Sequence, residues 1–380
     1  MIVSTYAIIA GGGTAGHVVP GLAIAHELVA RGVPMESVRY VGSSRGIEAR
    51  LVPEAGFPLT VLPGRGIQRK ATFANVGAVL GLIAAVVHGI ALVGRARPAV
   101  VVGLGGYASV PCIIGAVVWR IPLVVAEQNA VPGAANRLAG RFAKACAVSF
   151  EGTDLPRSTW TGNPVRREVL AIAEASAADR ADARERLAVS AERTLVAVFG
   201  GSLGARRINE AVADAVAAMG DRASVAVRHV SGRRDHLDIV SRTAGHQSLA
   251  LQYDLVEYED DMPSVYAAAD LVLCRAGASS VAELTVAGVP AILVPLPGAP
   301  GDHQTANARA LVDAGAARLV PDAELDADRA RSEIEALLDD PHRRAQMARA
   351  ARTLARPDAA AAVVDVVTAH ARRSVHEEAA

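Results

Sequence analysis

The sequence has 380 residues, more than one hydrophobic core usually serves, so we expect two domains of roughly 150 to 200 residues. Hydrophobic residues make up 51% and charged residues 21%, and the formal net charge is zero, which excludes a disordered chain and leads us to expect no nucleic-acid partner. Three widely spaced cysteines in apolar surroundings fit a reducing cytoplasm rather than disulfides or a metal cluster. Met1 leads almost directly into the first apolar run, so we expect no export signal.

Charge is divided unevenly along the chain. Residues 1–163 contain 14 Lys or Arg against 7 Asp or Glu, and residues 164–380 contain 25 against 32. In one interpretation, two oppositely charged domains attract each other. In the other, the first half faces an anionic membrane or ligand, where each well-placed basic residue contributes about 1 kcal/mol.

Short apolar runs alternate with longer helix-compatible segments, a pattern typical of parallel α/β sheets. The runs that we expect to form strands are 7–10, 38–41, 59–62, 100–104, 123–126 and 145–149 in the first half, and 195–199, 225–230, 251–256, 271–274, 291–294 and 317–320 in the second. Six strands in each half predict two doubly wound domains. Asn163-Pro164 favours a turn, so we expect domains over 1–163 and 164–357.

Two glycine-rich turns each follow one of these strands and precede a helix-like segment. They are Gly11-Gly12-Gly13-Thr14-Ala15-Gly16-His17 and Gly200-Gly201-Ser202-Leu203-Gly204-Ala205-Arg206. Glycine lets backbone N–H groups approach a ligand closely, and a helix N-terminus offers unpaired N–H donors. Each turn is therefore a candidate phosphate-binding site.

The segment 76–93 contains no charged residue and is flanked by arginine and lysine. A length of about 18 apolar residues is the threshold for a transmembrane helix. Three glycines and His88 weaken that interpretation, and the strand alternation needs a strand on both sides. We expect a helix that covers the sheet, with an outer face that contacts lipid or a partner; an inner helix covered by the rest of the fold is the alternative. The residues expected to enter the membrane are Phe73, Leu80, Ile83 and Val87.

The first turn also matches the G-x-G-x-x-G spacing of dinucleotide-binding enzymes through Gly11, Gly13 and Gly16. A nicotinamide enzyme needs an acidic residue at the end of the second strand, to bind the ribose. The sequence there is Val41-Gly42-Ser43-Ser44, which contains no acid, and the second turn lacks the spacing. A dehydrogenase is therefore disfavoured.

Six motifs stand in order along the chain: the two glycine-rich turns, Gly105-Gly106-Tyr107-Ala108-Ser109, Glu127-Gln128-Asn129, Gly162-Asn163-Pro164-Val165-Arg166, and Ala278-Ser279-Ser280-Val281-Ala282-Glu283. Together they resemble the N-acetylglucosaminyltransferase family of peptidoglycan synthesis that converts lipid I to lipid II. The resemblance covers nearly the whole chain. It implies a glycosyltransferase-B architecture, with two Rossmann-like domains facing a deep cleft and a C-terminal helix, 358–375, packing back on the first domain.

The resemblance also implies a peripheral enzyme on the cytoplasmic side of the cell membrane. It would transfer N-acetylglucosamine from UDP to the C4 hydroxyl of N-acetylmuramic acid with inversion, and work beside cell-wall and division proteins. The second glycine-rich turn would then receive the diphosphate of UDP. The first turn would lie where a lipid-linked pyrophosphate arrives.

An inverting transfer needs a general base for the attacking hydroxyl, typically worth roughly 10² to 10⁴ in rate. His17 is the expected base because it ends the first turn and histidine titrates near neutral pH, although its imidazole could instead only hydrogen-bond the glycine turn. Glu127 is the rival base, or the group that orients one. The resemblance places Gly12, Gly13, Tyr107 and Asn136 on the acceptor side.

The leaving UDP needs its negative charge stabilised, and one preorganised donor typically contributes about 3 to 4 kcal/mol. Ser202, with the backbone around it, fits this role, and Arg166 would reach from the interdomain loop. A metal-dependent transferase would carry Asp-x-Asp at a strand end, whereas Asp326-Ala327-Asp328 lies in a charged segment without strand character. We therefore expect no metal and no cofactor.

Glu283 suits the ribose of the nucleotide because a carboxylate can accept hydrogen bonds from both hydroxyls of a cis-diol. Ser280-Val281-Ala282-Glu283 also matches a helix capping box, and the resemblance favours the ribose. Further contacts to UDP-N-acetylglucosamine are implied by the resemblance at Thr14, Ala15, Gly16, Asn129, Glu259, Ala278, Ser279, Ser280, Val281, Ala282 and Gln304.

The sequence departs from the family pattern at Ala126, where a histidine is usual, and at His303, where a glutamine is common. Two other functions are compatible with parts of the sequence. A UDP-N-acetylglucosamine 2-epimerase would share the fold and nucleotide but would not need the uncharged helix. A non-catalytic lipid-pyrophosphate-binding protein would have no use for Glu283 and Gln304.

Overall fold

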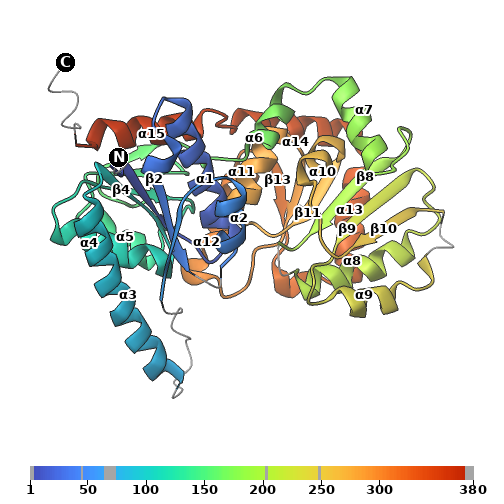
Figure 1. The fold of residues 1–380 in the computed structure, drawn as a ribbon. Coiled ribbons are helices and arrows are strands. Elements are labelled where there is room, and N and C mark those ends of the chain that lie inside the picture. The colour runs from blue at the N-terminus through green and yellow to red at the C-terminus, as the bar shows by residue number, and fades with distance from the viewer. Residues whose placement is uncertain (1–3, 44–45, 64–73, 202–203, 247–249, 373–380) are drawn as a thin grey trace. The chain divides into compact units, whose positions relative to one another are not determined.

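The computed structural model describes residues 4–43, 46–63, 74–201, 204–246 and 250–372. The chain divides into two compact units (Figure 1). The first unit comprises residues 1–166 and 358–380, and the second comprises 167–357. The first unit thus continues through Arg166, beyond the boundary expected at residue 163.

The first unit contains a seven-stranded parallel sheet of order β3-β2-β1-β4-β5-β6-β7. Its strands are β1 Ala7–Gly11, β2 Val38–Ser43, β3 Leu59–Leu62, β4 Val100–Gly105, β5 Leu123–Glu127, β6 Ala145–Val148 and β7 Ser158–Trp160. The six expected strands are present, but the count of six was wrong. β7 was missed because all three of its residues are exposed; it pairs with β6 at the sheet edge, where Nε1 of Trp160 also donates to Ser149 O at 3.2 Å.

Successive residues of the central strands point into cores on opposite faces of this sheet. Ile9 and Val102 pack into one core with the C-terminal helix α15 (Ala359–His370), and Ile8 and Val101 pack into the other with α4 (Val110–Val118). Because both faces are covered, nothing polar interrupts the strands, which explains why the apolar runs predicted them.

The remaining helices of the first unit are α1 Ala15–Ala30, α2 Glu48–Glu54, α3 Ala74–Ala96 and α5 Ala134–Gly140. The C-terminal helix α15 packs on α1, where Arg31 Nη2 donates to Ala361 O at 3.0 Å and the Arg31 guanidinium pairs with Asp365. This helix ends at His370, earlier than the expected residue 375, and residues 373–375 lie outside the described part of the chain.

The second unit contains a six-stranded parallel sheet of order β10-β9-β8-β11-β12-β13. Its strands are β8 Thr194–Phe199, β9 Val225–Val230, β10 Gln252–Val256, β11 Leu271–Cys274, β12 Ala291–Leu293 and β13 Ala317–Leu319. Its helices are α6 Arg167–Leu170, α7 Ala177–Arg186, α8 Arg206–Ala218, α9 His236–Arg242, α10 Met262–Ala268, α11 Ala278–Ala287, α12 His303–Asp313, α13 Ala327–Leu338 and α14 Pro341–Thr353. All six strands expected for this half are present.

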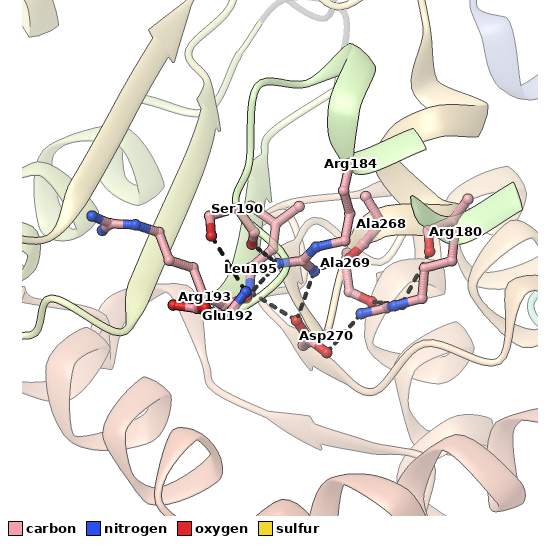
Figure 2. A network of polar contacts seen from close by, with 10 residues as sticks. Arg180, Arg184, Ser190, Glu192, Arg193, Leu195, Ala268, Ala269 and Asp270 are labelled. Carbon is pink, nitrogen blue, oxygen red and sulfur yellow. Dashed lines mark hydrogen bonds and ion pairs between the residues drawn. The ribbon is translucent and has the colours of Figure 1, made fainter. Parts of the chain in front are cut away.

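A polar network fastens α7 to the amino-terminal edge of this sheet (Figure 2). Asp270, just before β11, accepts hydrogen bonds from Leu195 N at 2.8 Å and from Arg180 Nη2 at 2.7 Å. Arg184, whose side chain is only 7% exposed, pairs with Asp270 at 3.4 Å and donates to Ser190 O at 2.8 Å. The network lies at the edge opposite the second glycine-rich turn, which follows the carboxyl end of β8. The network therefore stabilises the packing of α7 on the second sheet and is not a candidate ligand site.

Candidate active site

The first glycine-rich turn joins β1 to α1 at the carboxyl edge of its sheet, where doubly wound folds bind ligands. Gly13 has a φ of 90°, in the left-handed region that favours glycine. Thr14 is the N-cap residue of α1, and its side chain makes no capping hydrogen bond. His17 is half-buried in the first turn of α1, with Nδ1 3.3 Å from Thr14 Oγ1. The turn therefore combines a helix N-terminus with an imidazole.

Glu127 is the last residue of β5 and is buried. Its Oε1 accepts hydrogen bonds from N and Nδ2 of Asn129, at 2.9 and 3.2 Å. Its Oε2 accepts from Gly133 N at 3.0 Å and from Asn136 Nδ2 at 2.9 Å. Four N–H donors thus occupy the lone-pair directions of this carboxylate. Of the two roles expected for Glu127, the geometry favours an orienting group over a proton acceptor.

The loop after β4 lies against the first turn. A Cβ on Gly106 would lie 3.3 Å from Gly12 O and 3.5 Å from Cε1 of His17. The next residue, Tyr107, has a buried hydroxyl that finds no hydrogen-bond partner among the described residues, and the same holds for Oδ1 of Asn136. Burial raises the pKa of Tyr107. These residues, with His17 and Glu127, form the first half-site at one edge of the sheet.

A buried carboxylate that the sequence did not reveal also touches the first turn. Glu48, the first residue of α2, accepts a hydrogen bond from Gly13 N at 2.9 Å and from Ser43 N at 2.8 Å. Burial opposes the charged form, but the hydrogen bonds from Ser43 and Gly13 outweigh it and lower the pKa of Glu48. No local motif marks it, because two of the three glycines that surround it, Gly12 and Gly42, come close to Gly46 and Glu48 only in the folded chain.

In the second unit, the glycine-rich turn after β8 leads into α8. Ser202 lies outside the described residues. Gly204 has a φ of 76°, and a Cβ there would lie 2.1 Å from Ser231 O, so the turn packs directly on the backbone after β9. The close approach explains why this position is glycine.

A buried polar chain lies behind this turn, and sequence reasoning missed it. His229 on β9 has Nδ1 2.7 Å from the hydroxyl of Tyr253 and Nε2 3.1 Å from Oδ1 of Asn209. Asn209, in the first turn of α8, donates from Nδ2 to Ser231 O at 2.8 Å. The chain therefore joins β10, β9 and α8, and so supports the start of the helix that follows the second turn.

Glu283 lies on α11, buried, and its Oε2 accepts a hydrogen bond from the hydroxyl of Tyr266 at 2.9 Å. The capping-box alternative was wrong, because α11 begins at Ala278 with Gly277 as its N-cap and without a side-chain cap. Ser280, Val281 and Ala282 are thus interior helix residues. The hydroxyl of Ser279 is buried without a partner among the described residues. Tyr266, another residue missed from sequence, fixes one oxygen of the carboxylate.

Two further expected contacts lie in the second unit. The carboxylate of Glu259 accepts a hydrogen bond from Arg228 Nη2 at 2.7 Å. A ligand would therefore contact the backbone of Glu259 rather than its side chain. Gln304, in the first turn of α12, accepts from Leu296 N through Oε1 at 2.9 Å. Arg166 is half-buried and ends the first unit. We refer to Glu259 and Gln304, with Glu283, Ser279 and the glycine-rich turn of this unit, as the second half-site, because they are its candidate contacts for the nucleotide sugar.

The long apolar helix is α3, and its amino-terminal part extends away from the sheet (Figure 1). Ile83 and Val87 are 55% and 60% exposed, one helical turn apart on the same face. Phe73 lies outside the described residues, and the side chain of Leu80 is likewise not described. No helix within the described ranges is long and apolar enough to span a bilayer.

The Asp-x-Asp sequence has a structural use. Asp326 is the N-cap of α13, and its Oδ1 accepts a hydrogen bond from Arg329 N at 2.8 Å. The exposed Asp328 pairs with Arg331. Across the described parts of the chain, no cluster of three or more His, Cys, Asp or Glu side chains is arranged to hold a metal ion.

Two family models match the chain. The N-terminal domain of glycosyltransferase family 28 matches residues 7–148, and the C-terminal domain of that family matches residues 195–363. The first match includes β1 to β6 and the first glycine-rich turn, and the second match includes the second sheet from Leu195 onward together with its own glycine-rich turn. The chain is therefore a glycosyltransferase with the glycosyltransferase-B fold.

Proteins of similar sequence show to which family of glycosyltransferases the chain belongs. A Myxococcus xanthus protein named UDP-N-acetylglucosamine--N-acetylmuramyl-(pentapeptide) pyrophosphoryl-undecaprenol N-acetylglucosamine transferase is 40% identical over 364 residues, which cover 94% of this chain and 91% of that protein. An Alkalilimnicola ehrlichii protein of the same name is 42% identical over 367 residues, covering 96% and 99%. The chain belongs to this transferase family, and the family resemblance expected from the six motifs is confirmed.

Solved structures agree with this assignment. The crystal structure of Acinetobacter baumannii MurG has a TM-score of 0.74 and 29% identity, covering 96% of this chain and 99% of that one. A UDP-GlcNAc 2-epimerase from Neisseria meningitidis has a TM-score of 0.67 at 12% identity, covering 97% and 100%. At that identity the epimerase shares the fold alone.

Proposed function

We propose that this chain transfers N-acetylglucosamine from UDP-N-acetylglucosamine to the C4 hydroxyl of N-acetylmuramic acid in lipid I, with inversion, and so forms lipid II. The observation that carries this proposal is the difference between the two half-sites. Each unit has a glycine-rich turn at the carboxyl edge of its sheet. The first turn ends in the half-buried His17, for which the second turn has no histidine counterpart, and the second unit carries the buried carboxylate Glu283, which suits a ribose.

The second half-site binds the nucleotide sugar. Tyr266 holds Oε2 of Glu283, which supports a role for this carboxylate in accepting the two ribose hydroxyls. Backbone groups at Glu259 bind the uracil, and Gln304 binds the sugar. Ser202, the N–H groups around it and Arg166 stabilise the charge on the leaving diphosphate.

The first half-site binds the acceptor and activates it. The imidazole of His17 accepts the proton of the C4 hydroxyl as the oxygen attacks C1 of N-acetylglucosamine. The bond from C1 to the diphosphate oxygen breaks, and UDP leaves with the negative charge. Glu127 orients Asn129 and the loop after β5, since its oxygens already accept four hydrogen bonds. Tyr107 and Asn136 line the acceptor side.

The enzyme works at the cytoplasmic face of the cell membrane as a peripheral protein. The exposed apolar residues of α3 support this location, because they would enter the interface, and Arg95 lies in the last turn of the same helix, with Arg97 just beyond its end. Liposomes containing anionic lipid should sediment the wild type, and the double substitution Ile83→Glu with Val87→Glu should reduce binding about 10-fold or more. Leu237→Glu, at a still more exposed apolar position on α9, is the control. Equal sedimentation of all three proteins would contradict the proposal.

Sugar transfer tests the proposed function. Radiolabelled UDP-N-acetylglucosamine and a lipid I analogue should give a lipid-linked disaccharide, and omission of the analogue should leave the nucleotide sugar unchanged. Formation of the manno isomer without acceptor would support the epimerase, and binding of the analogue without any sugar transfer would support the non-catalytic alternative.

A further inference from the structure

Glu48 reaches from the start of α2 to the first glycine-rich turn. The residue is fully buried. Its Oε2 accepts a hydrogen bond from Gly13 N at 2.9 Å, and its Oε1 accepts from N and Oγ of Ser43, both at 2.8 Å. Ser43 is the last residue of β2. One carboxylate thus ties the turn after β1 to the end of the neighbouring strand.

Three glycines leave the space that this carboxylate occupies. A Cβ on Gly12 would lie 2.2 Å from Oε1 of Glu48, a Cβ on Gly42 2.5 Å from its Cγ, and a Cβ on Gly46 2.0 Å from its Oε2. All three separations are below what real Cβ atoms tolerate. Gly12 and Gly42 do not have a positive φ. What these two positions require is therefore room for Glu48 rather than a glycine backbone conformation.

The carboxylate changes what the first turn can bind. The N–H of Gly13 is committed to Glu48, so this amide is withdrawn from any anion that approaches the turn. Glu48 also occupies the end of β2, where a dinucleotide-binding enzyme holds the ribose. These two effects leave the N-terminus of α1, with His17 in its first turn, as the part of the turn that faces a ligand.

We propose that Glu48 is a positioning residue for the acceptor: it fixes Gly12 and Gly13 so that α1 begins in the orientation that aims His17 at the attacking hydroxyl. A Cβ added to Gly106, in the loop after β4, would lie 3.3 Å from Gly12 O and 3.5 Å from Cε1 of His17, so this loop passes close to the turn that Glu48 holds from α2. The inference rests on the proposed role of His17 in the transfer. Glu48 touches no substrate and acts through the turn.

Two substitutions test the positioning role of Glu48, one at the carboxylate itself and one at a neighbouring glycine. Glu48→Gln keeps the shape but replaces one accepting oxygen by an NH₂ group, which faces a backbone N–H. Gly46→Ala leaves Glu48 intact but displaces its carboxylate from outside the turn. Both variants should lower kcat/KM for the lipid I analogue about 10- to 100-fold, because small misplacements of catalytic groups cost this much. The loss should appear mainly in kcat, the constant that depends on the position of His17, rather than in KM for UDP-N-acetylglucosamine. Glu54→Gln, an exposed position on the same helix, is the control.

Amide hydrogen exchange measures how well the first turn is ordered, and it needs no substrate. Peptides covering residues 10–19 should exchange faster in Glu48→Gln and Gly46→Ala than in the wild type or Glu54→Gln. In a Glu48→Ala background, Gly46→Ala should cost no further activity, because the carboxylate with which it collides is gone. An additive loss in that double variant would overturn the proposal, as would unchanged exchange in the single variants.

The kinetic and exchange results separate this inference from the proposed function. Faster exchange with unchanged acceptor kinetics would overturn the positioning role of Glu48. A wild type that transfers no sugar to lipid I would contradict the proposed function, and a His17→Ala variant with full activity would overturn both the assigned base and the positioning proposal.

Discussion

The hydroxyl of Tyr266 donates a hydrogen bond to Oε2 of Glu283 at 2.9 Å, and both side chains are buried. Tyr266 lies on α10, which precedes β11 in the sequence, and Glu283 lies on α11, which follows it, so the contact joins these two helices. The ring of Tyr266 also packs edge-on against Phe199, with the ring centroids 6.0 Å apart. This packing limits rotation of the phenol, and the carboxylate of Glu283 is therefore held in one orientation.

Tyr266→Phe should raise KM for UDP-N-acetylglucosamine about 3- to 10-fold, because one hydrogen bond to a buried group contributes about 0.5 to 1.5 kcal/mol. The change keeps the ring and its contact with Phe199, so the fold should persist. Steady-state kinetics with each substrate varied in turn provide the measurement. KM for the lipid I analogue serves as the internal control, and an equal rise in both constants would contradict a donor-specific role.

Asp270→Asn should destabilise the second unit by about 3 kcal/mol, because it removes the charge partner of the buried Arg184. The value is placed at the lower end of the range for buried pairs, since the Asp270 side chain is 27% exposed. Urea denaturation followed by circular dichroism measures the loss. Asp328→Asn, which breaks an exposed pair with Arg331, should change stability by less than about 0.5 kcal/mol. Equal effects of the two substitutions would refute the argument.

The buried imidazole of His229 makes stability depend on pH. Burial, with a smaller effect from His236, lowers the pKa of His229 to about 3. In the unfolded chain the imidazole binds a proton near pH 6.5. Between about pH 6.5 and 3 this imidazole is therefore protonated in the unfolded state but not in the folded state. The free energy of unfolding consequently falls as the pH is lowered.

His229→Gln should remove that dependence. The free energy of unfolding of the wild type should fall by about 1.4 kcal/mol more than that of the variant for each pH unit below about 6. Urea midpoints at pH 7.5 and 5.0 give the comparison. Parallel losses in both proteins would show that another group carries the effect.

Transfer activity should be unchanged in excess chelator. Asp326 caps α13 instead of binding a metal ion, and N–H donors and Arg166 stabilise the negative charge on the leaving UDP. The assay compares initial rates with and without EDTA. Loss of activity that Mn²⁺ or Mg²⁺ alone restores would contradict this prediction.

Much of the fold could be predicted because the central strands are buried on both faces. Such strands appear in the sequence as unbroken apolar runs, and 12 of the 13 observed strands were expected on that basis. The strand Ser158–Trp160 carries no such signal, because it lies at the sheet edge with all three residues exposed.

The candidate site could be predicted only in part. The glycine-rich turns, His17, Glu127 and Glu283 stand in recognisable motifs. Glu48 and Tyr266 do not, because each acts on a residue that is distant in sequence and near only after folding. The capping-box alternative for Glu283 arose for a related reason, since a four-residue pattern does not fix where its helix begins.

The assignment of His17 as the base of a sugar transfer to a lipid-linked acceptor is tested by the pH–rate profile of transfer to a lipid I analogue. The wild type and His17→Ala are compared as purified proteins in excess chelator. His17→Ala should lower kcat roughly 10² to 10⁴-fold and abolish the acidic limb of the profile, with KM for UDP-N-acetylglucosamine little changed. A variant that keeps most of kcat together with the acidic limb would contradict the assignment of His17.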